Sequence, residues 1–403
     1  MKLINLRSQN AWAGLALFLA SAVASSAAVL HVPADYRTIQ GAVDAAKSGD
    51  EIRIAAGRYA EQVLVASKNL KLIGDPGAVI EALPGLATTL TVYGDPDVQP
   101  LLGFALCDEV TVRGLTLDGK RLGPVNPGLV GVAFHGSSGR MEHCLVRGFR
   151  LATGIGGVGF GTVNSPFLGR PPQQVQVLGN HFEDNQNAIV IAADGAVQND
   201  VRLRFRIQRN TIVGSGPTDT ETQIGINVRA GTTGEIRNNT ISDHDFTGGF
   251  GFSQGILAEG SLEDSIPLPP IRYEDNTFRN NQNHVVSLLA DHSEFVNNTF
   301  QATGLGYRAG GLYVSGDHVR IVNNEFSDMP TGIMLFGDDP DFGTTLGIAR
   351  NATLIANQFC HVAMPILIEP LVTGTQEHGT QLNACQTPPH DGHGNGHGDQ
   401  HPD

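Results

Sequence analysis

A short unit built around an asparagine recurs along the chain and constrains the fold more than any other feature. In each copy a Phe or Ile follows the asparagine two positions later. The copies are VLGNHF, IQRNTI, IRNNTI, YEDNTF, FVNNTF, IVNNEF and LIANQF, and their asparagines are Asn180, Asn210, Asn239, Asn276, Asn298, Asn324 and Asn357. Two weaker copies, VRGLTL and EHCLVR, precede them with Leu115 and Cys144 near the asparagine position. Spacings of 22 to 37 residues between copies are typical of a solenoid of stacked coils.

A second pattern follows most units after a few variable residues: Gly or Ala, then two aliphatic residues at alternate positions, then Asp. It occurs as AIVIAAD (188–194), GLYVSGD (311–317), GIMLFGD (332–338) and, more loosely, VVSLLAD (285–291). This alternation predicts short strands and fits no helical period. The recurring aspartates, which we interpret as turn formers, are Asp194, Asp291, Asp317 and Asp338. One coil is therefore expected to run strand, turn, strand, asparagine turn, short strand and variable loop.

The asparagine position suits a sharp bend, because asparagine tolerates a left-handed φ and can hydrogen-bond its own backbone. In stacked coils the amides can also bond to one another, so we predict a buried ladder that includes Asn298. The Phe or Ile of each unit is expected to point into the core. The glycosylation sequons at 297–299 and 238–240 are then by-products of the repeat rather than surface acceptor sites.

These repeats resemble the PbH1 repeats of the right-handed parallel β-helix in the pectin-lyase-like superfamily, in its carbohydrate-binding and sugar-hydrolase members. The resemblance covers roughly Val29 to Ile368. It implies an all-β fold, a single-stranded parallel β-helix solenoid of about ten coils at roughly 4.8 Å per coil.

The start of this region strengthens the resemblance. Helical spacing of apolar residues predicts an amphipathic helix over 36–48, through Ile39, Ala42, Val43 and Ala46. In the family such a helix caps the open end of the solenoid, where exposed strands would otherwise aggregate. The segments SGDEIRI and GRYAEQVLV then look like the first coil.

The N-terminus is typical of an export signal. Lys2 and Arg7 precede an apolar stretch from Ala11 to Ala24, and small residues allow cleavage after Ala24 or Ala28. A membrane anchor is the alternative, but the apolar run is short and no later segment is apolar enough to span a bilayer. We therefore predict a signal peptide over 1–28 and a periplasmic or secreted protein.

The C-terminus departs from the repeat. We expect the β-helix domain to cover 29–387 and a disordered, histidine-rich tail to cover 388–403. Four tail histidines could bind Zn or Cu, namely His390, His393, His397 and His401. The alternative is a solvated tail with incidental metal affinity.

Four cysteines allow three disulfide pairings in an oxidising compartment. Cys360 and Cys385 bracket the last segment and could link it to the solenoid, whereas Cys107 and Cys144 could instead be buried thiols. No CxxC motif occurs, which argues against a structural zinc site of that type.

The charge balance limits the partners. With 40 acidic and 26 basic residues the formal net charge is −14, which disfavours nucleic acid and anionic membranes. An anionic polysaccharide stays possible if a basic groove or bound calcium holds it. A capped solenoid can be monomeric, and we expect a monomer.

In the superfamily that the repeats resemble, polysaccharide usually binds along the outward face of the first sheet. Alternation places these pairs there: Val190/Ala192, Asn227/Arg229, Leu257/Glu259, Ser287/Leu289, Tyr313/Ser315 and Met334/Phe336. The middle of this face is polar and its ends are apolar.

The segment SDHDFTGGFGFSQG after Ile241 is expected to be a charged loop beside Arg229 and Glu259, with Asp219 and Glu221 in the preceding loop. Carboxylates, a histidine and arginines there could bind calcium or a uronate, or perform acid–base chemistry on a glycan. We predict catalytic roles for Asp243, His244, Asp245 and Glu259, and substrate-binding roles for Asn227, Arg229, Arg279 and Tyr313. The alternative is that Arg229 and Glu259 merely pair across strands.

Enzyme motifs leave the reaction open between a lyase and a hydrolase. GRYAE (57–61) and LGRP (168–171) resemble pectin methylesterase segments, but the order differs and the aspartate motifs of that family are absent. The Asp-Pro-His-Glu of alginate epimerases and the Arg-x-Pro-x-x-Arg of pectate lyases are absent too.

Two classes of function follow. The first is an exported protein that binds or processes polysaccharide. The second is a non-catalytic β-helix, either an adhesion module or a protein similar to the periplasmic β-helix that helps assemble the copper site of nitrous oxide reductase, using the histidine-rich tail.

Overall fold

The computed structural model describes residues 27–88, 98–152, 157–164, 172–193, 201–249, 251–263, 265–302, 309–338, 344–383 and 385. The signal peptide predicted over 1–28 lies outside this part except for its last two residues. The predicted tail, with its four histidines, lies outside it entirely.

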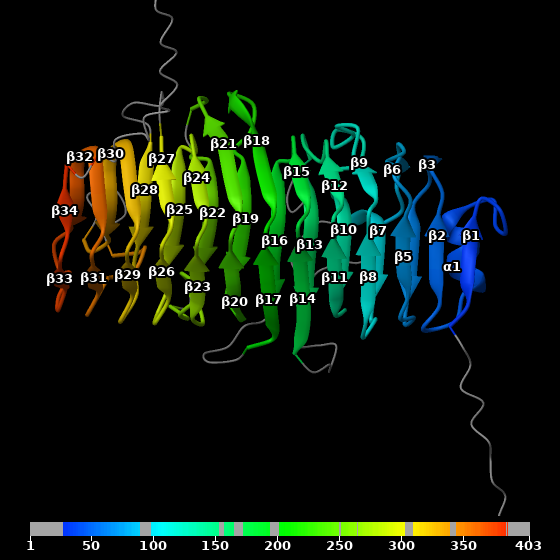
Figure 1. The fold of residues 1–403 in the computed structure, drawn as a ribbon, viewed down its shortest axis with the longest axis horizontal. Helices are drawn as coiled ribbons and strands as arrows, with labels where there is room; N and C mark the ends of the chain where they lie inside the picture. The colour runs from blue at the N-terminus through cyan, green and yellow to red at the C-terminus, as the bar shows by residue number, and fades with distance from the viewer. Residues whose placement is uncertain are drawn as a thin grey trace, which may run out of the picture.

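The described chain is almost entirely parallel strands stacked along one long axis. Figure 1 shows them running from α1 and β1 at the blue end to β33 and β34 at the red end. Each strand within a run pairs with the strands one coil before and one coil after it, in three runs, two of which join at β30 and β32. This pairing is a parallel β-helix, as the repeats predict. We call the three runs the first, second and third sheets.

The first sheet is the candidate groove face. Its strands are β4 (Val63–Ala66), β7 (Gln99–Ala105), β10 (Leu129–His135), β13 (Val158–Asn164), β16 (Asn187–Ala193), β19 (Ile224–Arg229), β22 (Gln254–Glu259), β25 (Asn283–Leu288), β28 (Gly310–Val314) and the second halves of β30 (Glu325–Leu335) and β32 (Gln358–Ile368).

The second sheet has 13 strands and precedes the asparagine turns. They are β1 (Val29–Val32), β2 (Glu51–Ile54), β5 (Lys71–Gly74), β8 (Val110–Arg113), β11 (Gly139–Glu142), β14 (Gln173–Leu178), β17 (Leu203–Gln208), β20 (Thr232–Arg237), β23 (Ile271–Glu274), β26 (Glu294–Val296), β29 (Arg320–Val322), β31 (Thr353–Ile355) and β33 (Gln376–His378).

The third sheet follows the asparagine turns. It contains β3 (Gly57–Ala60), β6 (Ala78–Glu81), β9 (Thr116–Asp118), β12 (Leu145–Arg147), β15 (His181–Glu183), β18 (Thr211–Thr218), β21 (Thr240–Phe246), β24 (Thr277–Arg279), β27 (Thr299–Gln301), the first halves of β30 and β32, and β34 (Gln381–Leu382).

The asparagine ladder is present as predicted. All seven ladder asparagines are buried, and the amide of each one before Asn357 donates to the Oδ1 of the asparagine one coil further on, at 3.0–3.1 Å. The predicted left-handed φ of these asparagines is wrong by one position. It is the preceding residue that turns left, for example Asn297 at φ 55° and Arg209 at φ 56°. The preceding residue makes the bend, which frees the ladder side chain to point along the stack.

The Phe and Ile residues two positions after each asparagine form the inner stack. Phe278, Phe300, Phe326 and Phe359 lie with ring centroids 4.6–5.0 Å apart and nearly parallel planes. All four are buried. Burial of aromatic surface with offset stacking stabilises each coil against its neighbours.

One helix begins the solenoid, α1 at Ile39–Ala45, shorter than the predicted 36–48. The side chain of Thr38 caps it by accepting a hydrogen bond from the Gly41 amide, and the chain is extended again at Ala46. Its apolar side packs against β1, β2 and β4. The capping role of this helix and the number of coils remain predictions.

The cysteines divide as one disulfide and two thiols. Cys360 and Cys385 are joined, whereas Cys107 and Cys144 are buried thiols outside any disulfide. Burial raises the pKa of the Cys144 thiol to about 12, so this thiol is unreactive at neutral pH. In the described part of the chain, no helix has the length and apolar character needed to cross a bilayer.

Candidate functional site

The outward side of the first sheet, which we call the outer face, is mostly apolar. Strand register places one row of outward residues in line across successive coils. This row reads Ala133, Gly161, Val190, Asn227, Leu257, Val286, Tyr313 and Met334. Asn227 and Tyr313 are the two polar residues of this row, separated by Leu257 and Val286.

Asn227 is the most buried polar side chain of that row, at 6% exposure. Its neighbours in register are Val190 and Leu257. The Oδ1 atom is buried and has no hydrogen-bond partner among the described residues. A buried amide oxygen without a partner is costly, so this position favours a ligand donor more than a purely structural role.

Arg229 and Glu259 stand directly opposite each other at the ends of β19 and β22. Their side chains form an ion pair. The arginine side chain is 46% exposed and that of the glutamate 16%. The cross-strand pairing interpretation is therefore confirmed, and the pair also presents its guanidinium to solvent.

Tyr313 lies two coils beyond Leu257 in the same row, half-buried beside Phe336, with ring centroids 6.2 Å apart. Burial raises the pKa of its hydroxyl, and a hydrogen bond with Thr331 opposes this shift. The hydroxyl is therefore protonated at neutral pH and available as a hydrogen-bond donor or acceptor.

The outward assignment of Ser287 and Leu289 is wrong. Ser287 pairs in register with the buried Ala258 and lies 3.3 Å from the hydroxyl of the buried Tyr273. Val286 and Leu288 take the outward positions instead. The strand begins at Asn283, which shifts the alternation by one residue from the pattern in the sequence.

The loop predicted after Ile241 begins later than expected, after Phe246. Asp243, His244 and Asp245 continue strand β21 of the third sheet and pair with β18, with His244 opposite Gly216 and Asp245 opposite Pro217. His244 and Asp245 are each only 1% exposed. Neither side chain is accessible to a polysaccharide.

His244 belongs to a polar cluster inside the coil. Its Nδ1 lies 2.8 Å from Oδ1 of Asn281, whose Nδ2 lies 3.1 Å from Nδ1 of His284. Burial lowers the pKa of His244 to about 4 and that of His284 to about 3. Both rings are therefore neutral at pH 7 and serve the packing of the core.

The remaining predicted residues are separated from the outer face. Arg279 ends β24 in the third sheet, exposed and in register with Ser242 and Gln301. Asp243 adopts a left-handed φ of 62°, within the same sheet. Only Asn227, Arg229, Glu259 and Tyr313 of the eight predicted site residues share the outer face.

Two of the recurring aspartates, Asp291 and Asp317, link successive coils through their side chains. Asp291 Oδ1 accepts a 2.8 Å hydrogen bond from the Asp317 amide, and Asp317 Oδ1 accepts one of 2.9 Å from Asn351. Asp194 and most of the segment around Asp339 lie outside the described residues.

A buried ion-pair network beside the outer face was not found from the sequence. Arg150 binds Glu221 at 2.5 Å and Asp184 at 2.7 Å, with side-chain exposures of 8%, 9% and 27%. Ser215 donates to Asp184 at 2.9 Å, and the exposed Arg121 adds two further bonds to Asp184. The network joins four successive coils.

The carboxyl of Asp184 is subject to two opposing effects on its pKa. Burial raises the pKa of its carboxyl, but the hydrogen bonds from Arg121, Arg150 and Ser215 outweigh burial and leave it below its ordinary value. Glu221, which the sequence placed in a loop at the groove, therefore neutralises Arg150 instead.

A second surface that the sequence analysis did not consider lies across the second sheet. An open hollow of ≈ 440 Å³ is lined by Gln174, Gln176, Arg204, Arg206, Thr233 and Glu235, among others. These residues are neighbours in register on β14, β17 and β20. The hollow is polar, with two arginines against one carboxylate.

At the N-terminal end the outer face has an apolar hollow of ≈ 240 Å³. Its walls include Leu64, Pro100 and Ala133. An apolar floor of this kind can contact the carbon face of a sugar ring but supplies no charged group.

Comparison with known proteins bears on the fold. No protein-family model matches the chain, and no curated protein matches it either. Among solved structures, the chain is similar to the A-module of the mannuronan C-5 epimerase AlgE4 from Azotobacter vinelandii, with 17% identity and a TM-score of 0.50 over 85% of this chain and 92% of that one.

Two further structures are more distant. A polysaccharide lyase of family PL6 from Pseudopedobacter saltans has 14% identity and a TM-score of 0.46 over 81% of this chain and 75% of that one. The ORF18 protein of Geobacillus virus E2 has 14% identity and a TM-score of 0.40 over 85% of this chain, which spans only 56% of the viral protein. The similarity to the epimerase module supports the fold alone, a right-handed parallel β-helix.

Proposed function

We propose that this protein is exported and binds a polysaccharide along the outer face of its first sheet. The observation that carries the proposal is the set of polar side chains on that face, interspersed with apolar ones: Asn227, Arg229, Glu259 and Tyr313. A sugar chain needs both parts, since its hydroxyls require hydrogen-bond partners and its ring carbons require apolar contact.

The buried Oδ1 of Asn227 supports a ligand that donates hydrogen bonds, such as a sugar hydroxyl. The half-exposed Arg229 guanidinium can donate two hydrogen bonds to a uronate carboxylate, in place of its bond to Glu259. The epimerase module of similar fold acts, as its name states, on mannuronan, which is a polyuronate.

Binding is favoured over hydrolysis. A glycosidase needs two carboxyl groups about 5–9.5 Å apart, flanking the scissile bond. In register, Glu259 is flanked by Arg229 and Leu288, so neither of its direct neighbours on the outer face is a carboxylate. A lyase-like reaction would require a base there other than His244, which is sealed in the core.

The test is a thermal-stability screen of the full chain against mannuronan, polygalacturonate and a neutral glucan, each with and without calcium. The same wells are assayed for unsaturated uronate and for reducing ends. We expect stabilisation by one acidic glycan and no product. Release of product would show that the protein is an enzyme. No stabilisation by any of the glycans would contradict the polysaccharide proposal.

A matched pair of arginine variants locates the site. Arg229→Ala should abolish the stabilisation, whereas Arg204→Ala, an exposed arginine on a strand of the second sheet, should leave it unchanged. Loss of stabilisation in Arg204→Ala but not in Arg229→Ala would instead place the glycan site at the hollow of the second sheet.

A further inference from the structure

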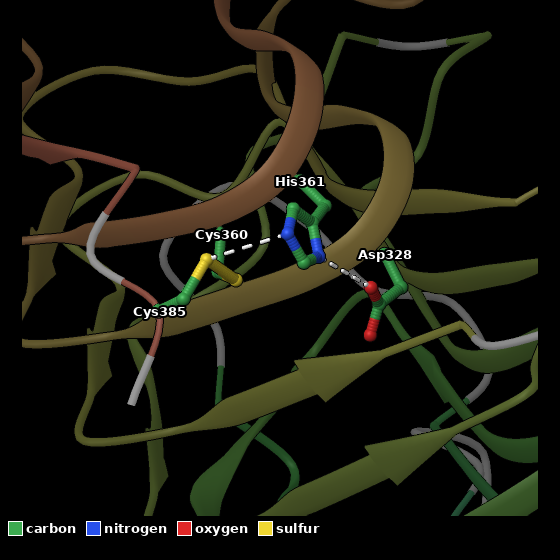
Figure 2. The surroundings of a disulfide bond; sticks show 4 residues. All are labelled: Asp328, Cys360, His361 and Cys385. Atoms are coloured by element: carbon green, nitrogen blue, oxygen red, sulfur yellow. Dashed lines mark hydrogen bonds and ion pairs between the residues drawn. A yellow bond between two sulfur atoms is a disulfide. The ribbon is translucent and has the colours of Figure 1, made fainter. Parts of the chain in front are cut away.

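The disulfide at the end of the solenoid lies against a histidine that is itself held by a carboxylate. Figure 2 shows the imidazole of His361 between the sulfur of Cys385 and the side chain of Asp328. Nε2 of His361 lies 3.6 Å from Sγ of Cys385, and Nδ1 lies 3.1 Å from Oδ1 of Asp328. The two ring nitrogens therefore have different partners, one sulfur and one oxygen.

The strand geometry builds this arrangement. Ser327 of β30 and Cys360 of β32 are in register, and so are Met329 and Val362, so Asp328 and His361 occupy the same position in successive coils. Both have a left-handed φ, 58° and 52° respectively. The shared irregularity places their side chains side by side, and it costs backbone strain that an ordinary strand would avoid.

The cluster is open to solvent. A hollow of ≈ 330 Å³ is lined by Asp328, Cys360, His361 and Cys385 together with residues of β27 and β30. The side chain of His361 is 72% exposed, and Cys385 is exposed. A small reductant or a metal ion can therefore reach the sulfurs without any opening of the core.

Reduction of the bond changes the chemistry of the cluster. A dithiol reductant transfers two electrons to the disulfide and becomes a disulfide itself, while Cys360 and Cys385 each gain a proton as thiols. In the oxidised form the two sulfurs and a ring nitrogen of His361 lie within 4.8 Å of one another, so reduction leaves three ligand groups around one hollow. Binding of a divalent cation releases the two thiol protons to solvent.

We propose that the reduced form of this cluster is a binding site for a thiophilic cation, Zn²⁺ or Cu⁺, with ligands Cys360 Sγ, Cys385 Sγ and His361 Nε2. Thiolate and imidazole are the ligand types that these ions prefer. Asp328 is a positioning residue, since its bond to Nδ1 fixes the tautomer in which Nε2 is free to ligate. The oxidised form holds no such site, so metal binding is gated by reduction. This proposal does not depend on the polysaccharide proposal.

The test uses the full chain, reduced anaerobically with a dithiol that is then removed, and titrated with Co²⁺ as a spectroscopic probe for Zn²⁺. A thiolate-to-Co²⁺ charge-transfer band reports sulfur ligation, which the tail histidines cannot produce. We expect the band in the reduced protein, its loss on oxidation or on addition of Zn²⁺, and its absence in Cys385→Ser. A reduced protein without the band, whether or not its last coil stays folded, overturns the proposal.

Three variants test the roles of the other residues. Asp328→Asn should weaken Zn²⁺ binding about 10–100-fold, as for other partners of ligating histidines, and His361→Gln should weaken it more. His318→Gln is the matched control, because His318 also pairs with an aspartate, Asp317 at 3.0 Å, but belongs to no cysteine-containing cluster of the described residues. Unchanged affinity in His361→Gln would overturn the three-ligand site.

Discussion

Arg229 at the end of β19 and Glu259 at the end of β22 form an ion pair across two neighbouring strands of the outer face. The arginine is the more exposed partner. A pair whose arginine is this exposed contributes about 0–1 kcal/mol to stability. Breaking the pair therefore costs little stability, and a bound uronate could replace Glu259 as the partner of the guanidinium.

Arg229→Ala should consequently lower the free energy of unfolding by less than about 1 kcal/mol. Chemical unfolding at neutral pH measures this directly. A loss of several kcal/mol would show that the pair is a structural element, and any loss of glycan binding in the variant would then no longer locate the site.

The ladder asparagines should behave quite differently. Asn298→Ala removes the acceptor of the Asn276 amide and the donor to Asn324, leaving buried polar groups without partners. Each such group costs about 1–3 kcal/mol, so we expect a loss of about 3 kcal/mol. Asn297→Gly is the control, because glycine keeps the left-handed φ of 55° and the ladder intact. Equal effects of the two changes would contradict the ladder account.

The buried histidines predict an acid-sensitive stability. Burial holds the folded pKa of His284 at about 3 and that of His244 at about 4, whereas an unfolded histidine titrates near 6.5. Below about pH 6.5 the unfolded chain binds protons that the folded chain does not. Stability present at pH 7 is therefore lost toward acid, by about 1.4 kcal/mol per pH unit for each histidine.

His284→Leu should flatten this dependence, because Nε2 of His284 is buried with no hydrogen-bond partner among the described residues and the ring lies near Phe278 and Phe300. Urea unfolding of both proteins at pH 7 and pH 5 measures the slope. An unchanged slope in the variant would show that another group is responsible.

The Arg150 network should contribute more than any surface pair. Arg150→Ala leaves Glu221 buried without its partner and removes one partner of Asp184, and breaking a buried pair in this way costs about 3–5 kcal/mol. Arg121→Ala removes an arginine whose side chain is 60% exposed from the same aspartate and should cost less than about 1 kcal/mol. Chemical unfolding measures both losses of unfolding free energy. Similar losses in the two variants would contradict the claim that the buried arginine matters more than the exposed one.

The fold was predictable because the same two residues recur in each coil. One asparagine marks a bend and one Phe or Ile marks an inward side chain, as Asn298 and Phe300 do. Positions where a coil departs from the repeat could not be predicted. Nothing in SDHDF shows that β21 continues as a strand, because its pairing with β18 is set by Gly216 and Pro217, residues far away in sequence.

The site was predictable only in part, for the same reason. Alternation placed Asn227, Arg229, Glu259 and Tyr313 correctly, but one shifted residue before Ser287 reversed the faces of β25. Arg150 and Glu221 are 71 residues apart and meet only because coils of unequal length stack. The Cys360–His361 dipeptide was a visible signal whose meaning needed the position of Asp328 one coil earlier.

The most direct test of the central claim is the dissociation constant for a polyuronate, measured calorimetrically with the full chain and the Arg229→Ala and Arg204→Ala variants. The account predicts measurable binding by the unmodified chain and by Arg204→Ala, and at least a tenfold loss, about 1.4 kcal/mol, in Arg229→Ala. Equal affinity in all three proteins, or no binding by any of them, would contradict a polysaccharide site on the outer face.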